Sequence, residues 1–413
     1  MQYQQHQLDN GLTIVAECNP NAYSTAFGYF VKTGARDEAP EIGGVSHFLE
    51  HMVFKGTPKR SADQVNLELD EMGSASNART GEEATIYHAA VLPEFQSDMV
   101  ELLSDLMRPS LRDEDFETEK KVIIEEIMMY QDQPPFGGHE RIMQLFFGSH
   151  PLGQSVLGTP DTVGGMNPEQ MQKYFQVRYS PSNMALAAAG KVDFDRLVKD
   201  AETFTAQWEN FSAERKHATA EYRLGFEMLH KPNSHQQYLL QLAPGPANSD
   251  PLRYAMRIAA VVFGDDGGSR MYWKLLDTGL AESAGCGPYE YHANGLVMCF
   301  VCCSPDQAQN NLQILNEIQT ELFENGITEK ELELAKQKVA SQIVLASERT
   351  ENRMFSAGSQ WLTGQPYKTV AQIAEIYQSV TLDQVNEAIK SFPLHQNMTL
   401  AVGPNDQLTP VTG

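Results

Sequence analysis

The stretch MNPEQMQKYFQVRYSPSNMALAAAG, residues 166–190, recurs later in the chain, and this repeat decides the fold. It aligns without gaps on VTLDQVNEAIKSFPLHQNMTLAVGP, residues 380–404, so that in both copies a helical pattern leads into a strand beginning Asn-Met-x-Leu. A second pair agrees, because LRDEDFETEKKVIIEEI at 111–127 matches ITEKELELAKQKVASQI at 327–343. The offsets of 214 and 216 residues are about half of the 413-residue chain. Self-similarity at this distance predicts a duplicated domain.

Each half carries strand and helix patterns intermixed. Apolar or alternating runs predict strands at 11–17, 24–34 and 183–190, whereas a period near 3.6 predicts helices at 61–73 and 96–109. The patterns show no regular βαβ alternation, which favours an α+β fold over a doubly wound sheet. We therefore expect two duplicated domains, 1–213 and 214–413, each a mostly antiparallel sheet packed with helices.

The helix predicted at 61–73 has recognisable ends. Ser61 is a plausible N-cap and Gly73 a plausible residue just beyond the C-terminus.

Composition excludes some partners. The chain has 31 Lys and Arg against 54 Asp and Glu, a formal charge of −23, and no basic run offsets it. Nucleic acid and anionic membrane surfaces are therefore not expected partners, and basic peptides would be tolerated. No run approaches the 18 or so apolar residues of a membrane span, and the N-terminus lacks a signal-peptide pattern, so we expect a cytoplasmic chain unless a leader was trimmed. The five cysteines are expected to be reduced and mostly buried.

The segment GGVSHFLEHM, residues 43–52, places two histidines and a glutamate within five positions. His47 and His51 are spaced i, i+4, so on a helix both imidazoles lean to one side and reach one ion. Glu50 lies on the same face. A catalytic zinc takes three protein ligands, often two His and one Glu, and leaves one position for water. One carboxylate ligand is still missing from this segment.

The missing carboxylate is expected in ETEKKVIIEEIMMYQDQP, residues 117–134, which reads as a helix. Glu119 and Glu126 are two turns apart and share a face with Val122 and Ile123 nearby, whereas Glu125 points about 100° away from Glu126. Carboxylates on a buried face need a cation. Glu126 as ligand and Glu119 as the group that orients a ligand satisfy this need.

The chain thereby resembles the pitrilysin and insulinase family of inverted-motif zinc peptidases, in particular the branch of mitochondrial processing peptidase and its bacterial relatives. HFLEHMVFKGT (47–57), with 74 residues between His51 and Glu126, carries the resemblance. The likeness covers nearly the whole chain and includes LDNGLTIV (8–15), GSASNARTGEEATIYHA (73–89), EKKVIIEEIMMYQDQP (119–134), HPLGQSVLGTPDTV (150–163) and RYSPSNMALAAAG (178–190).

The resemblance implies a Zn²⁺-dependent metalloendopeptidase. His47, His51 and Glu126 would be the zinc ligands, Glu50 the general base, and Glu119 the outer carboxylate, so that Glu50 and Glu119 are the expected catalytic pair. Glu50 would accept the proton of the attacking water and pass it to the leaving amine.

The family also implies how substrate binds. Asn77 and Ala78, in the strand-like SASNARTGEEAT, would lie on a sheet edge that pairs with an extended peptide. Members of the branch are half-clamshells that close by dimerising, and the substrates expected are peptides or unfolded segments.

The second half departs from the metal pattern. Gln342 stands opposite Glu126, Ala335 opposite Glu119, and GGSRMYWKL (267–275) opposite the histidine motif. We therefore expect one zinc site in each chain, in domain 1–213, and a homologous domain 214–413 without metal.

An Arg and Tyr pair typical of the family's second half is also absent, since Leu275 and Glu282 stand in its place. Two alternatives follow: the zinc-bearing subunit of a heterodimer whose related partner carries the pair, or a homodimer with a substrate clamp of Arg270, Tyr289 or Tyr291. A non-catalytic core or scaffold subunit with a structural zinc is the competing class of function. Glu50 argues against it, because a structural site has no use for an unliganded carboxylate.

Overall fold

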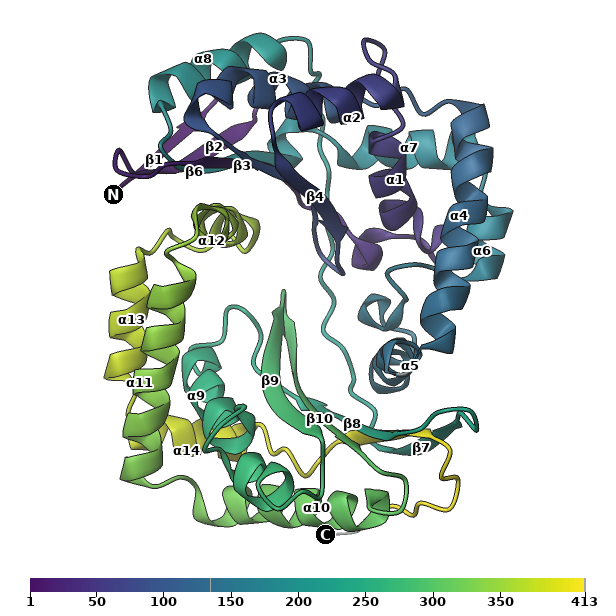
Figure 1. The fold of residues 1–413 in the computed structure, drawn as a ribbon, viewed down its shortest axis with the longest axis vertical. Coiled ribbons are helices and arrows are strands. Elements are labelled where there is room, and N and C mark those ends of the chain that lie inside the picture. The colour runs from purple at the N-terminus through teal and green to yellow at the C-terminus, as the bar shows by residue number, and fades with distance from the viewer. Residues whose placement is uncertain (134, 412–413) are drawn as a thin grey trace. The chain divides into compact units, whose positions relative to one another are not determined.

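The computed structural model describes residues 1–133 and 135–411 (Figure 1). The chain forms two compact units. The first comprises Met1–Met128, Gln154–Lys216 and Ala346–Tyr367, and the second comprises Met129–Gly153, His217–Leu345 and Lys368–Gly413. Each unit is built around one β-sheet, and each is described by itself.

The first unit holds a six-stranded sheet in the order β1-β2-β6-β3-β5-β4. All neighbours are antiparallel except β2 and β6, and β4 is an edge strand. The strands are β1 Gln2–Gln7, β2 Thr13–Cys18, β3 Thr25–Val31, β4 Ala75–Thr80, β5 Thr85–Val91 and β6 Met184–Gly190.

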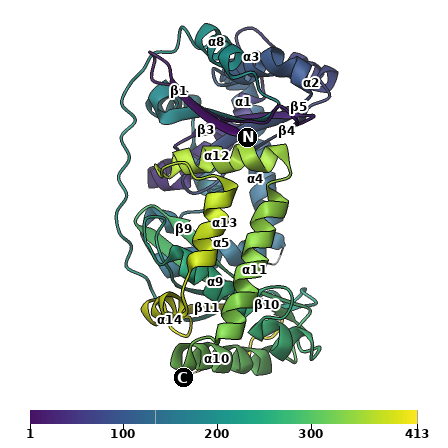
Figure 2. The ribbon, with the colours of Figure 1, turned by 90° about the vertical axis from the view of Figure 1, so that its left-hand side faces the viewer.

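Both faces of this sheet are buried, as the side chains of β3 show. Phe27 and Tyr29 enter a large core shared with helices of the first unit, whereas Phe30 points the other way, against Met354 and Ala357 of α12. Figure 2 shows α12 lying along this face of the sheet. Strands buried on both faces read as continuous apolar runs, which explains the sequence at 24–34. The helices are α1 Val45–Val53, α2 Ala62–Glu71, α3 Gln96–Leu106, α4 Asp113–Asp132, α6 Pro160–Gly165, α7 Pro168–Arg178, α8 Phe194–Phe204 and α12 Thr350–Leu362.

The second unit holds a five-stranded sheet in the order β7-β11-β8-β10-β9. Here β7 and β11 are the parallel pair, and the other neighbours are antiparallel. The strands are β7 Gly225–His230, β8 Gln237–Pro244, β9 Ser283–Tyr291, β10 Asn294–Cys303 and β11 Met398–Gly403. The helices are α5 Phe136–Phe147, α9 Arg253–Gly264, α10 Ala308–Asn325, α11 Glu329–Ala346, α13 Val370–Ser379 and α14 Leu382–Ser391.

The two sheets repeat one topology. The order β2-β6-β3-β5-β4 corresponds strand by strand to β7-β11-β8-β10-β9. The aligned helices even begin alike: Asn167 and Gln170 form a capping box at α7, and Thr381 and Gln384 form one at α14. The α+β class and the duplication are confirmed.

The compact units do not coincide with a cut at 213/214. Helix α5 follows α4, and α12 follows the equivalent α11, yet α5 covers the second sheet and α12 covers the first. The physical reason is that each sheet has a second apolar face to bury. The boundary between the two duplicated halves, 1–213 and 214–413, stays a prediction.

The predicted ends of the helix at 61–73 are confirmed. The Ser61 hydroxyl accepts a hydrogen bond from the Gln64 N–H, and Gly73 has φ +59° just past α2. All five cysteines are free, with Cys286 Sγ 3.2 Å from Cys299 Sγ. Among the described residues, no helix combines the length and the apolar character needed to cross a membrane.

Candidate active site

Helix α1 carries the histidine motif and begins at a position that only glycine tolerates. Gly44 has φ +92°, and a Cβ there would lie 2.5 Å from the Leu157 carbonyl oxygen. Val45, Phe48 and Leu49 are fully buried. The helix is therefore fixed by its core face, and its other residues are available for chemistry.

A buried carboxylate from outside the helix satisfies its first N–H groups. Glu38 Oε2 accepts from the Gly44 N–H at 2.6 Å, and Glu38 Oε1 accepts from the Ser46 N–H at 2.7 Å. A negative group at a helix N-terminus is favourable. Burial nevertheless raises the pKa of Glu38 to about 7, against the effect of these bonds.

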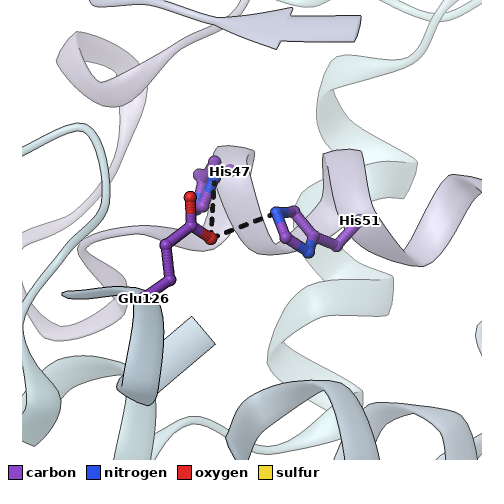
Figure 3. A group of neighbouring side chains, drawn as sticks. All are labelled: His47, His51 and Glu126. Carbon is purple, nitrogen blue, oxygen red and sulfur yellow. Dashed lines mark ion pairs between the residues drawn. The ribbon is translucent and has the colours of Figure 1, made fainter. Parts of the chain in front are cut away.

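The metal-binding candidates converge from two helices (Figure 3). His47 and His51 extend from successive turns of α1, and Glu126 reaches them from α4. Glu126 Oε2 lies 3.8 Å from His47 Nε2 and 3.5 Å from His51 Nε2. Ligand atoms around a tetrahedral zinc are roughly 3.3 Å apart, given metal–ligand bonds of about 2.0–2.1 Å. The cluster therefore fits a small divalent cation with little adjustment.

The second carboxylate of α4 orients one ligand. Glu119 Oε1 lies 2.9 Å from His51 Nδ1, and its other oxygen lies 2.5 Å from Lys55 Nζ. This arrangement leaves His51 Nε2 for a metal, which is the usual carboxylate–histidine–metal geometry. The prediction that Val122 shares this buried face is wrong, because Val122 is 48% exposed while Ile123 is buried.

The pKa values of the two histidines are shifted in opposite directions. Burial, helped by the charge of His51, lowers the pKa of His47 to about 3, so His47 is neutral and ready to bind a metal. Burial also opposes protonation of His51, but the surrounding carboxylates outweigh it and raise the pKa of His51. A cation competes with a proton for His51, so metal binding is expected to weaken as the pH falls.

Glu50 lies beside the cluster without joining it. Burial raises its pKa, and the Thr80 hydroxyl, 2.5 Å from Glu50 Oε2, donates a hydrogen bond that acts in the opposite direction. The three-donor group consists of His47, His51 and Glu126 and does not include Glu50. A carboxylate with a raised pKa next to a metal cluster suits proton transfer.

Strand β4 brings the expected substrate contacts to the same place. It is exposed along most of its length, and the Ala78 N–H is held by the Asn77 side-chain oxygen at 2.9 Å. That N–H therefore points away from β5, at the free edge of the sheet. A cavity of about 390 Å³ lies beside this edge, lined by Glu50, His51, Phe54, Asn66, Leu69 and Ala78, among others.

Leu275, which replaces the family's arginine, and the three clamp candidates of the second half lie in different settings. Leu275 is fully buried, and Tyr291 is 8% exposed. Arg270 pairs with Glu331 at 2.9 Å, and Tyr289 is 45% exposed. Of the three clamp candidates, Tyr289 is the one with an open side chain.

Comparison with known proteins agrees with this geometry. The family model described as insulinase (peptidase family M16) matches residues 13–160, and the model described as peptidase M16 inactive domain matches residues 165–339. A protein described as an uncharacterized zinc protease from Bacillus subtilis is 32% identical, over 91% of this chain and 92% of its own length. The chain belongs to the insulinase family of peptidases. A second uncharacterized zinc protease of similar sequence, from Streptomyces coelicolor, is 30% identical over 96% of this chain and 88% of its own.

Solved structures share the fold. A protease from Helicobacter pylori superimposes with a TM-score of 0.91 at 18% identity, covering 97% of this chain and 99% of that one. A structure from Pseudomonas fluorescens described as a peptidase M16 inactive domain gives 0.91 at 16% identity and covers both chains fully.

The structure brings together every predicted residue of the first half: His47, Glu50, His51, Glu119 and Glu126, with Asn77 and Ala78 beside them. Sequence reasoning missed Glu38, Lys55 and Thr80. Lys55 follows His51 by one helical turn, so helical spacing could have predicted that Lys55 also contacts Glu119. Glu38 and Thr80 reach α1 from a loop and a strand, and no periodic signal marks them.

Proposed function

We propose that this chain is a zinc-dependent endopeptidase that hydrolyses peptides or unfolded segments, with Glu50 as the general base. The observation that carries the proposal is the unliganded Glu50 carboxylate, held by Thr80 next to a His₂Glu cluster. The zinc proteases among the relatives support the choice of metal.

His47, His51 and Glu126 would hold the zinc ion. Two imidazoles and one carboxylate suit zinc, and a catalytic site of this type keeps its fourth position open. A bound zinc ion makes a water molecule acidic near neutral pH and polarises a carbonyl group. Glu50 accepts a proton from the attacking water and returns it to the amine that leaves.

The free edge of β4 would bind the substrate backbone. An extended peptide adds to the edge and exchanges hydrogen bonds with it, so that the Asn77 side chain must give up the Ala78 N–H. Phe54 and Leu69 give the neighbouring cavity an apolar part. This cavity would take one apolar side chain of the substrate, next to the bond that is cleaved.

A non-catalytic scaffold with a structural zinc is the second candidate. The family name of the second-half model, inactive domain, favours it for residues 165–339 only. A structural zinc site is closed by a fourth protein ligand, whereas this cluster offers three. Catalysis is therefore the better account of the first half.

Assembly belongs to the same proposal. Leu275, in place of the arginine, is buried and apolar, and Glu282, in place of the tyrosine, carries a negative charge instead of a phenol, so neither can act as the substrate clamp. A homodimer using Tyr289, or a heterodimer with a related chain that supplies an Arg and Tyr pair, would complete the site.

The test compares metal content and cleavage of a quenched-peptide library by the wild type and by Glu50→Gln. We expect about one zinc per chain in both and cleavage only by the wild type. Zinc in both with cleavage in neither would favour the scaffold or the heterodimer, and adding a sister chain with the Arg and Tyr pair then separates these two. Equal cleavage by both proteins would exclude Glu50 as the base.

A further inference from the structure

The Thr80 hydroxyl is the group that holds Glu50. Thr80 is the last residue of β4, and its Oγ1 lies 2.5 Å from Glu50 Oε2. A hydroxyl that donates to a carboxylate forms a short, charge-assisted hydrogen bond. The bond takes one lone pair of Oε2, so Oε1 is the less restricted oxygen to receive a proton.

The position of Thr80 is set by the turn that follows it. The Ala35 N–H donates to the Gly81 carbonyl oxygen at 3.2 Å, and the Arg36 N–H donates to the Glu82 carbonyl oxygen at 2.8 Å. A Cβ at Gly34 would lie 2.2 Å from the Gly81 oxygen, so this loop approaches the turn as closely as glycine permits. The hydroxyl is therefore presented from a fixed backbone.

Glu50 needs such a restraint. Its flexible side chain samples several rotamers when it is not held, and a nearby cation attracts a loose carboxylate as an additional ligand. The hydroxyl opposes both tendencies, since it ties one carboxylate oxygen to the strand. It also distinguishes Glu50 from Glu126, which lies within 4 Å of both histidines.

We propose that Thr80 is a positioning residue, whose hydroxyl keeps the Glu50 carboxylate turned toward the proton it accepts and away from the metal ligands. The inference rests on the proposed peptidase function. Thr80 lies on β4, the strand proposed to pair with substrate, but its side chain faces Glu50. Its loss is therefore expected to affect turnover more than substrate binding.

Thr80→Val removes the hydroxyl and keeps both the shape of the side chain and the backbone pairing with Thr85. We expect kcat to fall about 10- to 100-fold, a large part of what a general base contributes, while KM stays within about twofold. Thr80→Ser should restore most of kcat because it restores the donor. Thr85→Val is the matched control: its hydroxyl donates to the Thr33 carbonyl oxygen at 3.0 Å, so kcat should stay at the wild-type value.

A second measurement needs neither metal nor activity. In metal-free protein, Thr80→Val should lower the urea midpoint of unfolding in the wild-type background and have a smaller effect in the Glu50→Ala background, because the bond is already lost there. Equal effects in both backgrounds, or an unchanged kcat in Thr80→Val, would overturn the inference. Wild-type protein that cleaves nothing, either alone or with a sister chain that carries the Arg and Tyr pair, would overturn the peptidase function instead, and the urea cycle would still decide whether Thr80 holds Glu50.

Discussion

At the scale of single residues, the site depends on groups that never touch a metal. Glu119 is 5% exposed in its side chain and bonded to both His51 and Lys55. These partners lower its pKa although burial acts in the opposite direction, so Glu119 is charged when it orients His51. The histidine is held in the tautomer that leaves Nε2 free for a ligand role.

We predict that Glu119→Gln weakens zinc binding about 10- to 100-fold, because the neutral amide orients His51 less firmly and makes it a poorer ligand. Competition with a chelator of known zinc affinity measures the change. Glu125→Gln, on the same helix but exposed, is the control and should bind zinc like the wild type. Equal affinities for all three proteins would show that Glu119 has no part in holding the metal.

Glu38 makes the stability of the metal-free protein depend on pH. The unfolded chain releases the Glu38 proton above its ordinary pKa of 4.5, whereas the folded chain keeps it until about pH 7. The folded state binds more protons in between, so stability falls as the pH rises through this window and is level above it. We predict that the unfolding free energy of the wild type, relative to Glu38→Gln, falls by on the order of 3 kcal/mol between pH 4.5 and 7.5.

Urea unfolding at several pH values measures this difference, and exposed Glu41→Gln should show no comparable change. A difference that grows with pH would mean that the two N–H groups of α1 hold Glu38 charged despite its burial.

At the scale of elements, β4 combines an open edge with a link to the base. In an antiparallel edge strand, every second residue points its N–H and C=O groups away from the neighbouring strand. Ala78 is one of these residues in β4. An unpaired strand edge can pair with a further strand. In the absence of a peptide, the Asn77 side chain accepts the hydrogen bond of the outward Ala78 N–H.

We predict that Ala78→Pro lowers kcat/KM for extended peptides about tenfold or more, because it removes the outward N–H without taking a bond from the β4–β5 ladder. Zinc content should be unchanged, since Ala78 lies outside the ligand cluster. Continuous peptide cleavage assays and metal analysis of the same samples provide both values. Unaltered kcat/KM would place the substrate away from this edge.

The same elements show what sequence can predict. The His47, His51 and Glu126 cluster was accessible because helical spacing fixes which side chains share a face. Thr80 was not, because its contact with Glu50 depends on how a hairpin is placed against a helix 30 residues earlier. The exposure of Val122 was not predicted for a related reason. Periodicity identifies the apolar face of a helix, but it does not say how much of that face the neighbouring elements cover.

At the scale of the whole chain, the interleaving of the two halves was beyond sequence reasoning. The repeat identifies equivalent helices, and an amphipathic pattern shows that each buries a face. Neither states which sheet receives it. Met354 and Ala357 of α12 cover the first sheet, while Ile142 and Phe146 of α5 cover the second, although each helix belongs to the other half of the sequence. The first half of the chain therefore lacks α12, which belongs to the first unit, and the second half lacks α5, which belongs to the second unit.

We predict that fragment 1–216 alone does not fold, because it lacks the segment 346–367 and exposes the apolar sheet face around Phe30. Co-expression with fragment 217–413 should yield a soluble, copurifying pair, since each fragment supplies the helix that the other lacks. A version of 217–413 without 346–367 is the matched control and should fail to rescue fragment 1–216. Size-exclusion chromatography and dye binding to exposed apolar surface distinguish the outcomes. A monomeric fragment 1–216 with cooperative unfolding would show that the first sheet does not need α12, and the two halves would then be independent domains.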